Sequence, residues 1–162
     1  MYFRDTSPSN KMTFVVDCML GKLAKWLKIL GFDVLFFPKA EDDDLLAIAR
    51  RDGRTLLSRD HALLGRAKGL TKLLIESETW EDQVRQVLAH FVLDAEARPY
   101  SRCVECNAAL RPLPKSQAAN LVTPFVLEHA ETFAVCPSCA RVYWPGTHFS
   151  DMEAKLAEIL KK

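Results

Sequence analysis

Apolar positions in residues 12–97 alternate between short β-prone runs and longer segments with helical spacing. The β-prone runs are residues 13–16, 34–37, 55–58 and 72–75. Helical spacing is found in residues 20–30, 42–51, 60–68 and 78–91, where apolar side chains recur on one helix face. Such an alternation of strands and helices predicts an α/β fold, in which helices flank a parallel sheet.

Residues 98–149 interrupt this alternation, because they are rich in proline and show no long helical period. Residues 150–162 return to helical spacing, and residues 1–11 follow no periodic pattern. We therefore expect four parts. They are a flexible tail over residues 1–11, a sheet domain over 12–97, a small module over 98–149 and a C-terminal helix over 150–162.

Four of the five cysteines lie in the small module as two C-x-x-C pairs, Cys103 with Cys106 and Cys136 with Cys139. Two such pairs supply the four thiolates of a tetrahedral Zn²⁺ site, which leaves no position open for water and is therefore structural. Residues 132–135 and 142–144 are expected to form a hairpin that carries the second pair, as in a zinc ribbon. The alternative is four unrelated buried cysteines. Cys18 stands apart and is expected to be a small buried apolar residue.

Acidic residues follow two of the predicted strands. Asp17 ends the first strand and Asp60 the third, while Asp42 and Asp43 open the helix after the second strand. If the first and third strands are neighbours, these carboxylates converge at one edge of the sheet, where ligands bind in open α/β folds. Oxygen ligands in such a cluster suit Mg²⁺ or Mn²⁺. The alternative is that the acids cap helices or complement their dipoles.

Composition narrows the function classes only a little. The chain has 162 residues, 49% of them apolar, and a net charge of +1, which excludes a histone-like binder but allows local basic faces. Basic residues that could contact phosphates occur in two places. Lys22, Lys25 and Lys28 are spaced i, i+3, i+6 in the first predicted helix, and Arg59 follows the third predicted strand. The alternative is a solvated helix face. No apolar run approaches the about 20 residues of a membrane span, and the first residues lack a signal peptide, so we expect a cytoplasmic protein.

The run of residues 17–27, DCMLGKLAKWL, resembles the opening motif of the Mut-seven carboxy-terminal ribonuclease family. Further segments match in order, namely residues 31–34, 42–49 and 56–60, the two C-x-x-C pairs, and residues 142–148. The resemblance covers about residues 13–150. It implies a PIN-like nuclease domain over residues 12–97, followed by a zinc ribbon over 98–149, and metal-dependent cleavage of RNA.

Carried over residue by residue, the resemblance implies that Asp17 and Asp60 bind Mg²⁺ or Mn²⁺, with Asp42 and Asp43 as further catalytic acids. PIN-type sites often have a fourth acid after the next strand. In this chain only Glu76 and Glu78 stand near that place, and either would be a weak substitute.

Two functional hypotheses follow, with a lesser third. The first is a hydrolase, a ribonuclease whose Mg²⁺ or Mn²⁺ is held by the acidic cluster. The second is a non-catalytic RNA- or ribosome-binding module, in which the ribbon and the lysines bind and the acids are structural. The third is a phosphoacceptor receiver domain. It needs an acidic pair at the end of the first strand, where Asp17 and Cys18 supply only one acid.

Overall fold

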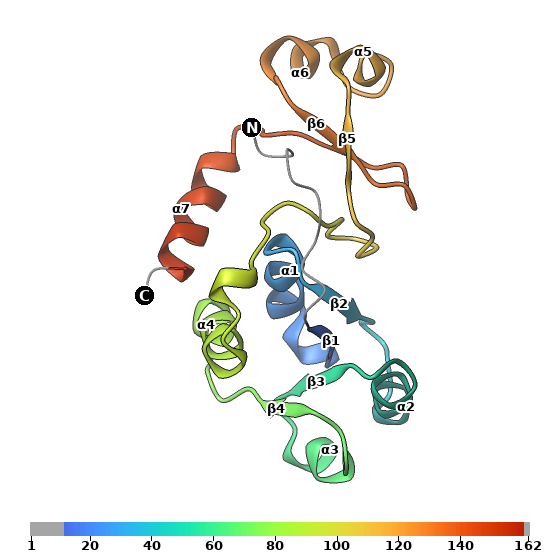
Figure 1. Ribbon diagram of the computed structural model, residues 1–162, viewed down its shortest axis with the longest axis vertical. Coiled ribbons are helices and arrows are strands. Elements are labelled where there is room, and N and C mark those ends of the chain that lie inside the picture. Colours follow the sequence, from blue (N-terminus) through green and yellow to red (C-terminus); the bar gives the residue numbers. More distant parts are fainter. Residues whose placement is uncertain (1–11, 161–162) are drawn as a thin grey trace.

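The computed structural model describes residues 12–160 (Figure 1). A parallel sheet has the strand order β2-β1-β3-β4, with β1 (Thr13–Val16), β2 (Asp33–Phe36), β3 (Thr55–Ser58) and β4 (Lys72–Leu74). Its helices are α1 (Gly21–Ile29), α2 (Asp42–Asp52), α3 (His61–Arg66) and α4 (Trp80–Phe91). The predicted fold class is therefore confirmed. The expected tail over residues 1–11 lies outside the described residues.

Helices cover both faces of this sheet, which explains why its inner strands β1 and β3 are almost wholly buried. Val15 packs with Leu45 of α2 and Leu63 of α3 on one face. Its neighbour Val16 belongs to the other cluster, with Leu23 of α1. Successive side chains of a strand point to opposite faces, so each central strand contributes to both cores.

The C-terminal helix α7 (Phe149–Ile159) packs back on the sheet domain. Its residues Leu156 and Ile159 are buried in the cluster formed by α1, α4 and the sheet. Trp26 of α1 stacks on Trp80 of α4 with ring centroids 4.4 Å apart, and the ammonium of Lys155 lies 5.9 Å from the centre of the Trp80 ring. Among residues 12–160, no helix has the length and apolar character needed to cross a membrane.

The small module is an antiparallel sheet of three strands in the order β5-β6-β7, with β5 (Arg111–Leu113), β6 (Phe133–Val135) and β7 (Val142–Tyr143). The last two strands form the hairpin expected from residues 132–135 and 142–144. The short helices α5 (Lys115–Ala118) and α6 (Pro124–His129) lie between β5 and β6. Neither is long enough to produce a helical period in the sequence. Two 3-10 turns, η1 (Cys18–Leu20) and η2 (Asp94–Glu96), complete the described elements.

A polar junction joins the module to β2, an edge strand. The side chain of Asn107 accepts a hydrogen bond from the amide of Val34 at 2.9 Å and donates one to Asp33 at 2.8 Å. Arg54 donates to the same Asp33 oxygen at 2.6 Å. Burial alone would raise the pKa of Asp33, but the hydrogen bonds from Arg54 and Asn107 outweigh it and lower that pKa. The junction therefore depends on an ionised Asp33.

A close backbone approach at Gly31 reinforces this junction. The amides of Arg98 and Tyr100 donate to the carbonyls of Leu30 and Ile29 at 2.7 and 2.8 Å, which brings the chain directly over the end of α1. Gly31 has a φ of 92°, and a β-carbon at this position would lie 2.3 Å from the carbonyl oxygen of Arg98. Only glycine fits both the backbone angle and the space.

We predict that Gly31→Ala lowers the free energy of unfolding by about 3 kcal/mol, because it adds a backbone clash to the left-handed strain. The matched control is Gly53→Ala. Gly53 also has a positive φ, of 64°, but no atom lies within 4 Å of its added β-carbon, so we expect a loss of about 1 kcal/mol. Urea unfolding of both variants measures the difference. Equal losses would contradict the close approach at Gly31.

Candidate metal centres

The four paired cysteines come together in the module. Their sulfur atoms all lie within 4.8 Å of one another, with Cys106 and Cys136 at 3.2 Å and Cys103 and Cys139 at 3.7 Å. Thiolates about 2.3 Å from a tetrahedral Zn²⁺ would be separated by about 3.8 Å, so this set fits zinc. Within residues 12–160, it is the one group of three or more His, Cys, Asp or Glu side chains at this spacing.

Both C-x-x-C pairs adopt the same turn. The residue after each second cysteine is left-handed, with φ of 67° at Asn107 and 59° at Ala140. Each of these residues donates its amide to the carbonyl of the first cysteine of its pair, Cys103 or Cys136, at 2.9 Å. The two turns place their sulfurs opposite each other, so the module supplies two matching halves of one site.

The thiols differ in how readily they ionise. Burial opposes ionisation of Cys103, but the amide of Cys106 and the hydroxyl of Tyr143, at 3.0 Å, lower the pKa of this thiol to about 7. Burial and the neighbouring thiols raise the pKa of Cys106 to about 12. A metal ion must therefore displace protons from some of the thiols, and zinc binding is expected to release protons near neutral pH.

The second candidate centre lies at the carboxyl edge of the sheet. β1 and β3 are neighbours, as the acidic site requires, and the amide of Asp17 donates to the carbonyl of Leu57 at 3.0 Å. Asp17 is 4% exposed. The hydroxyl of Ser58 donates to Asp17 at 2.6 Å and accepts from the amide of Asp60 at 2.9 Å. Ser58 thus orients Asp17 and links it to Asp60, a role that its place in the strand-end motif did not reveal.

No lysine or arginine of residues 12–160 forms an ion pair with Asp17. Its other neighbour is Cys18, whose thiol has a raised pKa because it is hydrogen-bonded to Asp17 and close to its charge. Cys18 is exposed and not buried as the apolar sequence around it suggests, because β1 ends at Val16 and the chain turns into η1. The buried carboxylate of Asp17 therefore has no cationic partner among the described residues.

The other predicted acids have protein partners. One oxygen of Asp60, Oδ1, accepts from the amides of Ala62 and Leu63 at 2.7 and 3.2 Å and so caps α3. Its Oδ2 accepts no hydrogen bond from the described residues. Arg66 of α3 pairs with both Asp42, at 3.6 Å, and Asp43. No three of the predicted acids come within 4.8 Å of one another in residues 12–160, so their joint role stays a prediction.

The predicted phosphate contacts divide into two groups. Lys22 and Lys25 are exposed on α1, whereas Lys28 is 5% exposed and donates to the carbonyl of Val104 in the module at 3.3 Å. Lys28 follows Lys22 by six residues, and the helix rotates over these residues by about 120° less than two full turns. The side chain of Lys28 therefore lies on a different face of α1 from that of Lys22. Arg59 is half-buried and donates to the carbonyl of Ser77 at 3.3 Å.

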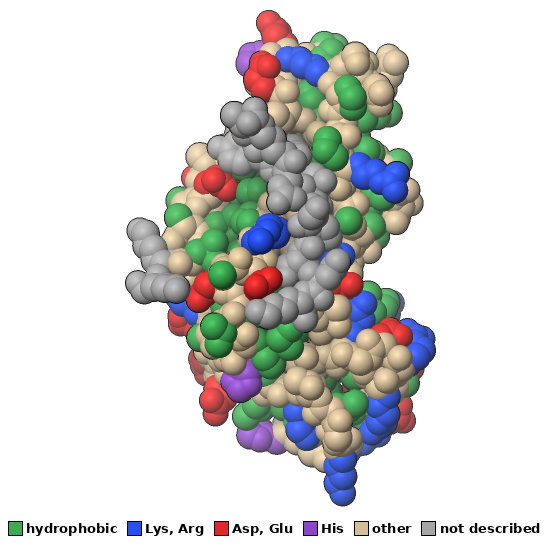
Figure 2. Space-filling view, in the orientation of Figure 1, with side chains coloured by type: hydrophobic (Ala, Val, Ile, Leu, Met, Phe, Trp, Pro, Cys, Tyr) green, Lys and Arg blue, Asp and Glu red, His purple; other side chains and the backbone are tan. Residues whose placement is uncertain are grey.

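Further exposed cations gather over α2 and α3, in the lower part of the face that Figure 2 shows. The exposed basic side chains of these helices and the loop after them are Arg50, Arg51, Arg66 and Lys68. This surface continues from Asp42 and Asp43 through their contact with Arg66. Arg66 therefore lies beside the acidic edge, whereas Arg50 and Arg51 lie in the last turn of α2.

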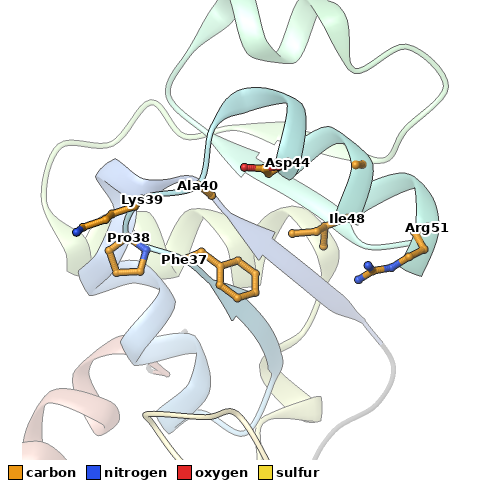
Figure 3. Close-up of a pocket in the computed structure, with 8 residues that line it drawn as sticks. Phe37, Pro38, Lys39, Ala40, Asp44, Ile48 and Arg51 are labelled. Atoms are coloured by element: carbon orange, nitrogen blue, oxygen red, sulfur yellow. The ribbon is translucent and has the colours of Figure 1, made fainter.

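Two hollows border the carboxyl edge. One, of about 420 Å³, lies between η1 and the start of α4, and Lys22 and Glu78 are in its lining. The other, of about 800 Å³, lies between α2 and the end of β2, where Phe37, Ile48 and Arg51 line it (Figure 3). It contains none of the acids predicted to bind metal. Of the weak substitutes for a fourth acid, Glu78 borders the first hollow and Glu76 is exposed.

We predict about one zinc ion per chain in protein purified without chelator, because all four thiolates converge on one point. Cys136→Ser should lose the metal and loosen the module, since metal binding supplies folding free energy. Cys18→Ser is the matched control and should retain zinc, because Cys18 lies outside the cluster. Elemental analysis checks both. A zinc-free wild type with four reduced thiols would contradict the assignment.

Comparison with known protein families gives a match over nearly the whole chain. A family model described as the Mut7-C RNAse domain matches residues 12–156, which include the acidic edge, the cysteine cluster and most of α7. No curated protein and no solved structure matches the chain. The family match supports a ribonuclease-type function and RNA as the substrate. Because the match covers nearly the whole chain, this protein belongs to the Mut7-C RNAse domain family.

Proposed function

We propose that this protein is a metal-dependent ribonuclease, which hydrolyses RNA phosphodiester bonds with Mg²⁺ or Mn²⁺ held at the carboxyl edge of the parallel sheet. The observation that carries the proposal is the carboxylate of Asp17. It is 4% exposed, no described cation pairs with it, and Ser58 holds it in a fixed orientation. We also propose a cytoplasmic location, because free thiols for zinc require a reducing compartment.

Physical chemistry favours a cation at Asp17. A buried carboxylate without a counter-charge either becomes protonated or acquires a positive partner. The hydroxyl of Ser58 donates to Asp17 at 2.6 Å, which holds the carboxylate in one orientation. Hard divalent cations prefer carboxylate oxygens and keep several waters and substrate phosphates as their remaining ligands. A buried, oriented carboxylate at a sheet edge is therefore a suitable ligand for Mg²⁺ or Mn²⁺.

The residues around Asp17 have distinct tasks in this proposal. Asp17 and the free Oδ2 of Asp60 offer oxygen ligands, and Ser58 keeps them in register. A bound cation would supply an activated water and neutralise charge on the phosphate. Lys22 and Lys25, which are exposed on the helix that follows Asp17, hold the RNA backbone.

Asp42 and Asp43 are proposed as further catalytic acids that become available when Arg66 leaves them. The side chains of Arg66 and Asp43 are 51% and 83% exposed, so their ion pair contributes only about 0–1 kcal/mol. A phosphate group of the substrate can replace the two carboxylates as the partner of Arg66. RNA binding and release of the acids would then occur together.

The contacts of the acidic residues also support an alternative function, that of a non-catalytic RNA-binding module. Asp60 caps α3, and Asp42 and Asp43 pair with Arg66, so three of the four acids already have structural partners. A non-catalytic RNA-binding module would use the same basic surface and leave these acids in their present contacts. Asp17 distinguishes the two functions, because it has no comparable ionic partner within residues 12–160.

We predict that Asp17→Asn lowers Mn²⁺-dependent RNA cleavage at least about 100-fold, because it removes a charged ligand of the cation. RNA affinity should not change, since the basic residues are untouched. Without metal, the variant should be at least as stable as wild type, because a buried uncompensated charge is lost while Asn can still accept from Ser58. A cleavage assay, an RNA-binding titration and urea unfolding in EDTA measure the three quantities.

The matched control is Asp52→Asn, which removes an acid that pairs with Arg51 at the opposite end of α2. It should cleave RNA at the wild-type rate. Asp60→Asn should lose cleavage and keep its stability, because Asn caps helices about as well as Asp. Wild-type cleavage by Asp17→Asn would exclude the proposed site, and absence of cleavage in wild type with Mn²⁺ would favour the binding module.

We also predict that replacing Lys22 and Lys25 together with Gln weakens RNA binding and lowers the salt dependence of the affinity by about two phosphate contacts. The charge-matched control replaces Lys115 and Lys155, which are exposed on α5 and α7. Titrations at several salt concentrations give the slope. If both double variants have the wild-type slope, α1 does not contact the RNA backbone.

A further inference from the structure

Lys28 is a buried ammonium group without an acidic partner. Its side chain is 5% exposed in the last turn of α1. Among residues 12–160, its one polar contact is the carbonyl of Val104 at 3.3 Å, and no carboxylate of these residues forms an ion pair with it. A buried charge of this kind is costly unless an opposite charge lies near it. We therefore expect a negatively charged group near the ammonium of Lys28.

The charges around Lys28 belong to the cysteine module. Burial lowers the pKa of Lys28, and the groups that oppose this effect are Cys103, Glu105 and Cys106. The carboxylate of Glu105 is already paired with Arg141 at 3.1 Å. The remaining groups near Lys28 that can become negative are therefore Cys103 and Cys106 of the candidate zinc site, which become thiolates when a metal ion binds.

Zinc binding leaves this site negatively charged. Four thiolates and one Zn²⁺ carry two net negative charges. Two of the sulfurs, those of Cys103 and Cys136, belong to fully buried residues, so water solvates that charge poorly. A buried cation beside such a centre gains the attraction that it lacks elsewhere in the fold.

We propose that Lys28 is the counter-cation of the zinc–thiolate centre and that it thereby couples zinc affinity to helix α1 of the sheet domain. Its ammonium stabilises the negative centre directly. It also holds the carbonyl of Val104, which lies inside the first C-x-x-C turn, and so fixes the turn whose amides point at Cys103. Groups outside the ligand set commonly change metal affinity about 10- to 100-fold.

The first experiment measures zinc affinity in the full chain by competition with a chromophoric chelator. Lys28→Met keeps most of the buried side-chain volume but removes the charge, and we expect about 10-fold weaker zinc binding. Lys28→Arg keeps the charge and should recover part of the loss. The matched control is Lys25→Met on the exposed face of the same helix, which should bind zinc as wild type does.

The second measurement separates charge from packing. With zinc bound, Lys28→Met should be less stable than wild type towards urea. In the metal-free protein it should be equally stable or more stable, because a buried cation without thiolate partners is removed. Equal losses with and without zinc would show that Lys28 only packs, and would overturn the proposal.

A spectroscopic readout remains available if the metal-free chain does not unfold cooperatively. Cobalt(II) can replace zinc in the site and shows a thiolate-to-metal charge-transfer band. Removing a nearby cation raises the energy of the sulfur lone pairs, so this band should move to lower energy in Lys28→Met and stay in place in Lys25→Met. An unmoved band together with unchanged zinc affinity would overturn the proposal. None of these measurements uses RNA cleavage, so their outcome is independent of the proposed ribonuclease function.

Discussion

The adjacency of β1 and β3 is the constraint on which both candidate centres depend. Pairing of these strands puts Asp17 and Ser58 in hydrogen-bond contact at the carboxyl edge of the sheet. From the same edge the chain turns through η1 into α1, which crosses one face of the sheet and ends with Lys28 against the cysteine module. A different strand order would separate Asp17 from Asp60 and would direct α1 elsewhere.

The two centres solve the problem of buried negative charge in different ways. At the cysteine module, four sulfurs converge at zinc spacing and a buried lysine approaches from the sheet domain. At the sheet edge, Asp17 has hydrogen-bond donors but no cation within the described residues. The fold itself therefore supplies the counter-charge of the first centre, namely Lys28. The second must acquire one from solution, as expected of a catalytic metal site and not of a structural one.

Much of the fold can be predicted from the sequence, because hydrophobic spacing identifies each strand of the parallel sheet and each long helix, and paired C-x-x-C motifs identify the four thiol ligands. Strand β5 is too short and too exposed to be recognised in this way. Contacts between distant residues cannot be predicted in this way. The pairing of Arg66 with Asp42 and Asp43 depends on how α3 packs beside α2, and the bridging role of Ser58 depends on strand register. Lys28 appears equivalent to Lys22 in sequence, yet the helix rotation between them directs one to solvent and the other into the module.

Manganese binding at the sheet edge tests the central claim most directly. A crystal structure of the full chain soaked in Mn²⁺, with anomalous diffraction measured for manganese and for zinc, locates both metals in one experiment. The account predicts zinc among the four sulfurs and manganese within bonding distance of Asp17 and of the free oxygen of Asp60. Saturating Mn²⁺ with no anomalous peak at Asp17 would contradict it, because the buried carboxylate would then carry its charge without the proposed cation.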